Sequence, residues 1–159
     1  MDIFQRSIHL NAKKIDDDHL LVSSSLLDLE HSFHLDLTVQ LSTRKIVSAT
    51  ASMSKAPLTQ CLSALANFSQ LEGLAIERGI IKEMHSRLGG PKGCTHLVEL
   101  LTDVIRFTSM LLLGRIMGFQ SNFKETMTEE EIIAEGKQKL RNTCIVFADD
   151  HGGDKDLSP

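Results

Sequence analysis

The first third of the chain alternates between apolar and polar residues, which is the pattern of a β-strand with one buried face. In the clearest stretch the apolar side chains that share a face are Phe33, Leu35, Leu37, Val39 and Leu41. Residues 3–11 and 20–28 flank an aspartate-rich turn at 16–18, and a second polar connection covers residues 42–45. Residues 3–54 are therefore predicted to form a four-stranded antiparallel meander.

The rest of the chain shows the three-and-four spacing of apolar residues that marks one face of a helix. Three helices are predicted: one opened by Pro57, one ending at Gly89, and one running from about Thr95 to Met117. Their predicted buried faces comprise Leu58, Cys61, Leu62, Leu65 and Phe68; Ile76, Ile80, Ile81, Met84 and Leu88; and Leu97, Leu100, Leu101, Val104, Ile105, Thr108, Leu111 and Leu112. A capping box at 128–131 predicts a fourth helix. The predicted fold class is α+β, an N-terminal antiparallel β-meander followed by a layer of three to four helices packed on one face.

The predicted domain organisation is a single α+β domain over residues 1–148 and a disordered acidic tail over 149–159. The apolar run 144–147 is predicted to add a strand or to dock against the core. Residues 110–113 carry more apolar surface than one helix face needs, which predicts a homodimer or tight packing of this end.

Composition and charge narrow the classes of function. The formal net charge of −4, with no tryptophan or tyrosine, disfavours a nucleic-acid partner. No stretch is long and apolar enough to predict a membrane span and the amino terminus lacks a secretory pattern, so a cytoplasmic protein with reduced thiols is expected. His31 and His34 lie three residues apart in a strand and point to opposite faces, so they are interpreted as surface residues rather than as joint metal ligands.

The candidate functional site is a glycine-rich turn directly before the longest helix. The turn consists of Gly89, Gly90, Pro91, Lys92, Gly93, Cys94, Thr95 and His96. Its glycines permit a sharp bend, and its cysteine and histidine fall at the amino end of the helix, where unpaired N–H groups, the helix dipole and the lysine favour negative charge. The spacing is that of neither a Walker loop nor a dinucleotide fingerprint. The turn is predicted to bind a small anionic ligand or a protein partner; the plain alternative is a connection in which Cys94 and Thr95 are buried or capping residues.

A thiol or metal site centred on Cys94 is the alternative function. A cysteine at a helix amino end favours the thiolate, and His96 would then act as a base or a second ligand. A metal ion would need about two more ligands, and the candidates from other elements are Cys61, His85 and Cys144. Because Cys61 falls in a predicted apolar stripe, no resident metal or cofactor is expected; an iron-sulfur cluster or zinc is the alternative.

Five segments carry a resemblance to a known family. They are Ala49-Thr50-Ala51-Ser52-Met53, Pro57 with Cys61, Leu71-Glu72-Gly73-Leu74, the turn extended to Leu97, and Asn142-Thr143-Cys144. Together they resemble a bacterial family of unknown function, domain-of-unknown-function family 2889, over nearly the whole chain; that resemblance implies no activity.

A weaker likeness is to the NifU-type iron-sulfur scaffolds. These place a small antiparallel sheet before helices and a ligand cysteine at the start of a late helix, which is the position of Cys94 here. The likeness implies an iron-sulfur cluster as the cofactor. The upstream cysteine of those scaffolds is absent where this chain has Arg44 and Lys45.

Overall fold

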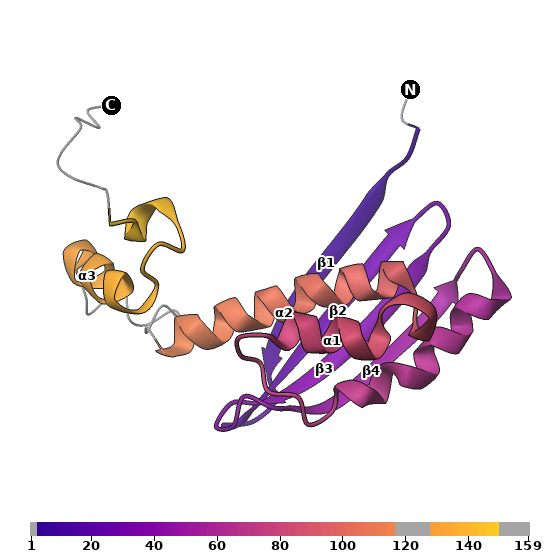
Figure 1. Ribbon diagram of the computed structural model, residues 1–159, viewed down its shortest axis with the longest axis horizontal. Helices are drawn as coiled ribbons and strands as arrows, with labels where there is room; N and C mark the ends of the chain where they lie inside the picture. Colours follow the sequence, from indigo (N-terminus) through magenta and orange to yellow (C-terminus); the bar gives the residue numbers. More distant parts are fainter. Residues whose placement is uncertain (1–2, 117–127, 150–159) are drawn as a thin grey trace. The chain divides into compact units, whose positions relative to one another are not determined.

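A four-stranded antiparallel sheet forms the base of the fold. The computed structural model describes residues 3–116 and 128–149, and the internal contacts divide the chain into two compact units, residues 1–112 and 113–159. In the first unit the strands follow one another in the order β1-β2-β3-β4 (Figure 1). Their bounds are β1 Arg6–Lys14, β2 His19–Asp28, β3 Ser32–Gln40 and β4 Ile46–Lys55. The predicted meander is confirmed.

Alternation along the strands explains the buried face of the sheet. Phe33, Leu35, Leu37 and Val39 are buried on β3, while His34 between them is exposed. The carboxylate of Asp18, in the first hairpin turn, accepts hydrogen bonds from the backbone N–H and the hydroxyl of Ser42 in the second. This contact ties the two turns together and fixes the register of neighbouring strands.

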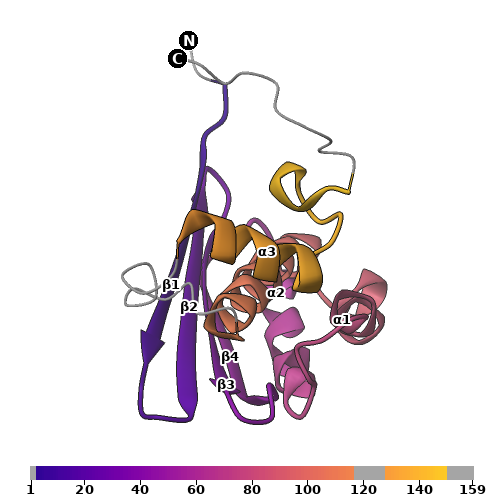
Figure 2. The ribbon, with the colours of Figure 1, turned by 90° about the vertical axis from the view of Figure 1, so that its left-hand side faces the viewer.

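A layer of helices covers one face of the sheet. It contains the 3-10 helix η1 (Thr59–Leu71), α1 (Ile80–Leu88), the short 3-10 turn η2 (Gly90–Lys92) and α2 (Thr95–Ile116). Figure 2 shows the sheet nearly edge on, with α1 and α2 on the same side of it. Their buried side chains join those of the sheet in one core. The predicted fold class, α+β with a helical layer on one face, is confirmed.

The buried face of η1 differs from the prediction. The expected stripe included Leu58 and Leu62, yet these side chains are 64% and 45% exposed, whereas Ala64, Phe68 and Leu71 are the buried ones. In a 3-10 helix residues three apart share a face, which places Phe68 with Leu71 and Cys61 with Ala64. Leu58 and Leu62 lie near the amino end of η1, where the packing on the core is weaker.

The segment before α1 is not helical, contrary to the prediction that Ile76 belongs to that helix. The backbone N–H of Gly73 donates to the carbonyl of Ile46 at 2.8 Å, and the N–H of Ile76 donates to the carbonyl of Arg44 at 2.8 Å. These bonds lay the segment along the edge of β4. Gly79, with φ +98°, then starts α1. Ile76 is still buried, because it joins the core from this edge segment.

The apolar stripe of α2 is confirmed, and it occupies one face of the helix. Leu100, Leu101 and Val104 are fully buried, whereas Met110 is 58% exposed and Leu113 is 41% exposed. Residues 110–113 are therefore not buried on all sides, and a homodimer through them stays a prediction. Met117, the expected last residue of this helix, lies outside the described residues. No helix in the described ranges is both long and apolar enough to cross a membrane.

The second unit contains α3 (Glu129–Lys139) and the 3-10 turn η3 (Ile145–Phe147). α3 begins with the predicted capping box, in which the hydroxyl of Thr128 accepts from the N–H of Glu131 and the carboxylate of Glu131 accepts from the N–H of Thr128. The run 144–147 contains the turn η3 and no strand. Phe147 lies against α3, since a Cβ added to Gly136 would overlap its ring.

Asp149 is the first residue of the tail that was expected to be disordered, and it is held in place. Its carboxylate accepts from the Arg141 guanidinium at 2.7 Å and from the Asn142 amide at 2.8 Å. These bonds lower the pKa of Asp149 from its ordinary value, the Arg141 contact most of all. The rest of the predicted tail lies outside the described residues.

Candidate functional site

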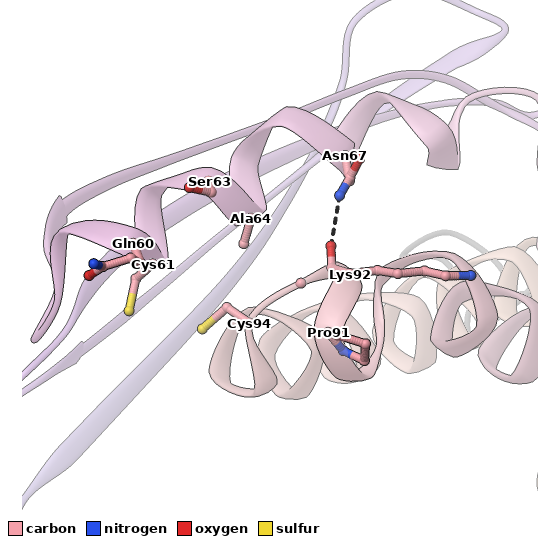
Figure 3. Close-up of a pocket in the computed structure, with 9 residues that line it drawn as sticks. Gln60, Cys61, Ser63, Ala64, Asn67, Pro91, Lys92 and Cys94 are labelled. Carbon is pink, nitrogen blue, oxygen red and sulfur yellow. Dashed lines mark hydrogen bonds between the residues drawn. The ribbon is translucent and has the colours of Figure 1, made fainter.

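A cavity of about 360 Å³ lies between η1 and the turn that precedes α2 (Figure 3). The residues that line it are Gln60, Cys61, Ser63, Ala64, Asn67, Pro91, Lys92, Gly93 and Cys94. The lining contains no aspartate or glutamate, and amide and hydroxyl groups from η1 supply most of its polar side chains. Its volume falls in the range of roughly 300–1,000 Å³ that is typical of small-molecule sites.

Glycine is needed at two positions of the turn, for a different structural reason at each. Gly90 has φ +58°, in the left-handed region that favours glycine. Gly93 has an extended backbone, but a Cβ added to it would overlap the carbonyl oxygen of Leu88, at the end of α1. Glycine at 93 is thus required by close backbone approach, which brings the start of α2 against the end of α1.

The amino end of α2 lies at the wall of the cavity. The first hydrogen bond of the helix runs from the Val98 N–H to the carbonyl of Cys94, with a distance of 3.0 Å. The N–H groups of Thr95, His96 and Leu97 consequently have no acceptor within the helix. Such a helix end favours a negatively charged partner. Cys94 also lines the cavity, so the N–H groups of Thr95, His96 and Leu97 follow a lining residue directly in the chain.

The ammonium group of Lys92 does not serve the cavity as the sequence predicted. It donates to the carbonyl oxygen of Ser86 at 2.8 Å, and Figure 3 shows the side chain running away from Cys94. The backbone carbonyl of Lys92 accepts a hydrogen bond of 2.7 Å from the side-chain amide of Asn67. This bond, drawn in Figure 3, fastens η1 to the turn.

Two cysteines face the same cavity. Cys61 and Cys94 are both half-buried free thiols, and Figure 3 shows the sulfur of Cys61 on the side of η1 that faces Cys94. The prediction that Cys61 is buried in a helix stripe is wrong, because the 3-10 winding of η1 turns it toward the cavity. Cys144, a third candidate, is exposed and belongs to the second unit.

The other candidate residues lie elsewhere. Thr95 and His85 are exposed, and His85 contributes its carbonyl as the acceptor for the N–H of Gly89 at the end of α1. His96 is not among the lining residues. Its ring instead packs against His31, with 4.1 Å between ring centroids. Cys94 and His96 are thus not brought together. Across residues 3–116 and 128–149, no group of three or more His, Cys, Asp or Glu side chains is arranged to hold a metal ion.

A buried ionic cluster beside His96 was missed by sequence reasoning. His31 is only 5% exposed, so its interpretation as a surface residue is wrong, whereas that of His34 is confirmed. The Nδ1 atom of His31 lies 3.0 Å from the carboxylate of Asp28, which Arg6 contacts at 2.8 Å. The Nε2 atom of His31 is buried with no hydrogen-bond partner among the described residues. The one sequence signal for this cluster was Asp28 at the end of a strand, because an aspartate there commonly accepts hydrogen bonds from the backbone of the following turn.

The electrostatics of the cluster follow from its hydrogen bonds. Burial raises the pKa of Asp28, but bonds from the Glu30 N–H, the Arg6 guanidinium and His31 outweigh burial and hold that pKa well below its usual range. The pKa of His96 is lowered, chiefly by burial and then by the nearby His31 and Arg6. Both shifts favour an ionised Asp28 beside a neutral His96.

One known family matches the chain, over residues that lie within the first unit. The family model described as "Protein of unknown function (DUF2889)" matches residues 4–108, a span that includes the sheet, the cavity and most of α2. This confirms the family named from the sequence, over residues 4–108 rather than over nearly the whole chain, so the segment 142–144 lies outside the match. No curated protein and no solved structure matches the chain, and nothing supports the likeness to NifU-type scaffolds.

Proposed function

Because this chain belongs to a family of proteins of unknown function, DUF2889, no activity can be carried over from that family, and we propose from the geometry that the domain binds a small anionic ligand. The ligand occupies the cavity between η1 and the turn before α2. The observation that supports this most is that Cys94 both lines the cavity and accepts the first hydrogen bond of α2. A ligand in the cavity would therefore lie beside a helix amino end.

The lining supports an anion of modest size. It has no carboxylate to repel negative charge, and Gln60, Ser63 and Asn67 offer hydrogen-bonding side chains. The helix amino end contributes partial positive charge, although Lys92 does not direct its ammonium group to this place. A phosphate or a small carboxylate fits this chemistry, because both accept several hydrogen bonds from N–H and hydroxyl donors.

A thiol-bound metal ion or iron-sulfur cluster is the second candidate, favoured by the meeting of Cys61 and Cys94 at one cavity. A site of this kind usually needs about four ligands, so solvent or an exogenous ligand would have to complete it. If this candidate is correct, freshly purified protein carries about one zinc ion or one cluster per chain. Elemental analysis would then show a metal that is lost in Cys94→Ser and retained in Cys144→Ser.

Anion binding predicts protection of one thiol. Inorganic phosphate at millimolar concentration is expected to slow the alkylation of Cys94 by iodoacetamide, because the bound anion covers the cavity wall. The measurement is timed labelling followed by peptide mass mapping. Cys144 is the internal control, since it is exposed and lies in the other unit.

A second arm replaces phosphate by sodium chloride at matched ionic strength, which separates binding from charge screening. Anion binding is contradicted if phosphate leaves the Cys94 rate unchanged, or if chloride slows it equally.

A further inference from the structure

We propose that Cys61 and Cys94 form a reversible disulfide bond across the cavity, which makes the cavity a site of thiol modification. The two thiols come from different elements, one from the first turn of η1 and one from the residue before α2. Both line the same cavity and both are half-buried free thiols. The inference requires only that the two sulfurs meet, and it holds whether or not an anion binds there.

The start of η1 is packed less firmly on the core than its second half. Phe68 and Leu71, the side chains of this helix that join the common core, lie in its second half. Nearer to Cys61, Ala64 is buried, but Leu58 and Leu62 are 64% and 45% exposed. Thirteen residues of 3-10 helix are also an uncommon length, because the hydrogen-bond geometry is poorer than in an α-helix. The first turns of η1 are therefore the part of it that can shift.

The far half of η1 keeps the two thiols in reach of one another. The bond from the Asn67 side chain to the carbonyl of Lys92 fastens η1 to the turn two residues before Cys94. A disulfide needs a Cα separation of about 4.4–6.8 Å, so bond formation reports directly on how closely the start of η1 approaches the turn.

The reaction with glutathione disulfide as oxidant is a pair of thiol–disulfide exchanges. The deprotonated sulfur of Cys94 attacks one glutathione sulfur, forms a mixed disulfide and releases one glutathione thiolate. The sulfur of Cys61, after losing its proton to solvent, attacks the sulfur of Cys94, and the bond to the second glutathione breaks. Two protein thiols are oxidised, one glutathione disulfide is reduced, and both glutathione thiolates take up protons.

The test treats the folded full chain with glutathione disulfide and maps disulfides by mass spectrometry without reduction. The expected product links the peptides that contain Cys61 and Cys94, while Cys144 carries glutathione. In Cys61→Ser the intermediate cannot resolve, so Cys94 is expected to remain as a stable glutathione adduct. Dithiothreitol should restore the free thiols in both proteins.

Cys144→Ser is the matched control, and it should leave the Cys61–Cys94 link unchanged. The proposal is overturned if Cys61 and Cys94 of the wild-type protein both end as glutathione adducts, if they remain unmodified while Cys144 reacts, or if the link involves Cys144. Circular dichroism of each variant before oxidation ensures that the comparison is made on folded protein, and the wild-type result decides the matter without any variant.

Discussion

Replacing Gly93 with alanine is expected to lower the free energy of unfolding by about 3 kcal/mol, at the upper end of what overpacking costs. The new Cβ would overlap the carbonyl oxygen of Leu88, which is backbone at the end of α1 and cannot rotate away. The turn must open, so the start of α2 moves from the end of α1 and the cavity loses its shape. Urea unfolding measures the loss, and faster alkylation of Cys94 should accompany it.

Gly90→Ala is the matched control in the same turn. Nothing lies within 4 Å of a Cβ at this position, so the cost is only that of a left-handed backbone at φ +58°, about 1–2 kcal/mol. Gly90→Asn should cost less still, because asparagine tolerates that region. Equal destabilisation by Gly93→Ala and Gly90→Ala would contradict the role assigned to close approach at Gly93.

Asp28→Asn is expected to destabilise the protein by about 1.5–3 kcal/mol at pH 7, the usual range for losing hydrogen bonds to a charged group. The amide would leave Arg6 with only the half-exposed Glu99 as a counter-charge. It would also disturb the hydrogen bonds that the carboxylate accepts from the Glu30 and His31 N–H groups. Urea unfolding at pH 7 gives the difference. Asp36→Asn is the control and should cost far less. Its carboxylate is partly exposed and, within the part of the chain that the structure describes, it bonds two side chains, those of Ser23 and His34.

The same variant carries a pH signature. The pKa of Asp28 is lower in the folded protein than in the unfolded chain, so its stabilising contribution is present in full above the unfolded value of about 3.9 and is lost as the pH falls below it. Wild-type protein should therefore lose stability steeply below pH 4, while Asp28→Asn loses less over that window. Parallel pH curves for the two proteins would contradict an ionised, hydrogen-bonded Asp28.

The sheet and α2 were predictable from sequence because their apolar residues repeat with the regular periods of strand and α-helix. Phe33, Leu35 and Leu37 alternate with polar neighbours, and Leu97, Leu101 and Val104 follow the helical spacing, so burial could be assigned from position alone. The capping box before α3 was also predictable, because it depends only on Thr128 and Glu131. In each case the signal and its structural consequence lie within a few residues.

Only one wall of the cavity, the turn before α2, was predictable from the sequence. The other wall is η1, and the sequence pattern does not reveal that η1 is wound as a 3-10 helix. A period of 3.6 placed Cys61 in the core, whereas the three-residue period of η1 turns it to the cavity opposite Cys94. His31 was misjudged because its burial depends on distant elements. Its partner Asp28 pairs with Arg6 of β1, and its ring packs against His96 of α2.

The most direct test of anion binding beside α2 is an amide ¹H–¹⁵N NMR titration with inorganic phosphate at constant ionic strength. The N–H groups of Thr95, His96 and Leu97 should shift progressively and saturate, together with those of Cys61 and Cys94 at the cavity wall, because a bound anion hydrogen-bonds or polarises them. The resonances of amides within the sheet, such as that of Ser25 in β2, should not shift. Saturating shifts confined to other regions, or no saturating shift at the amino end of α2, would contradict the proposed ligand site.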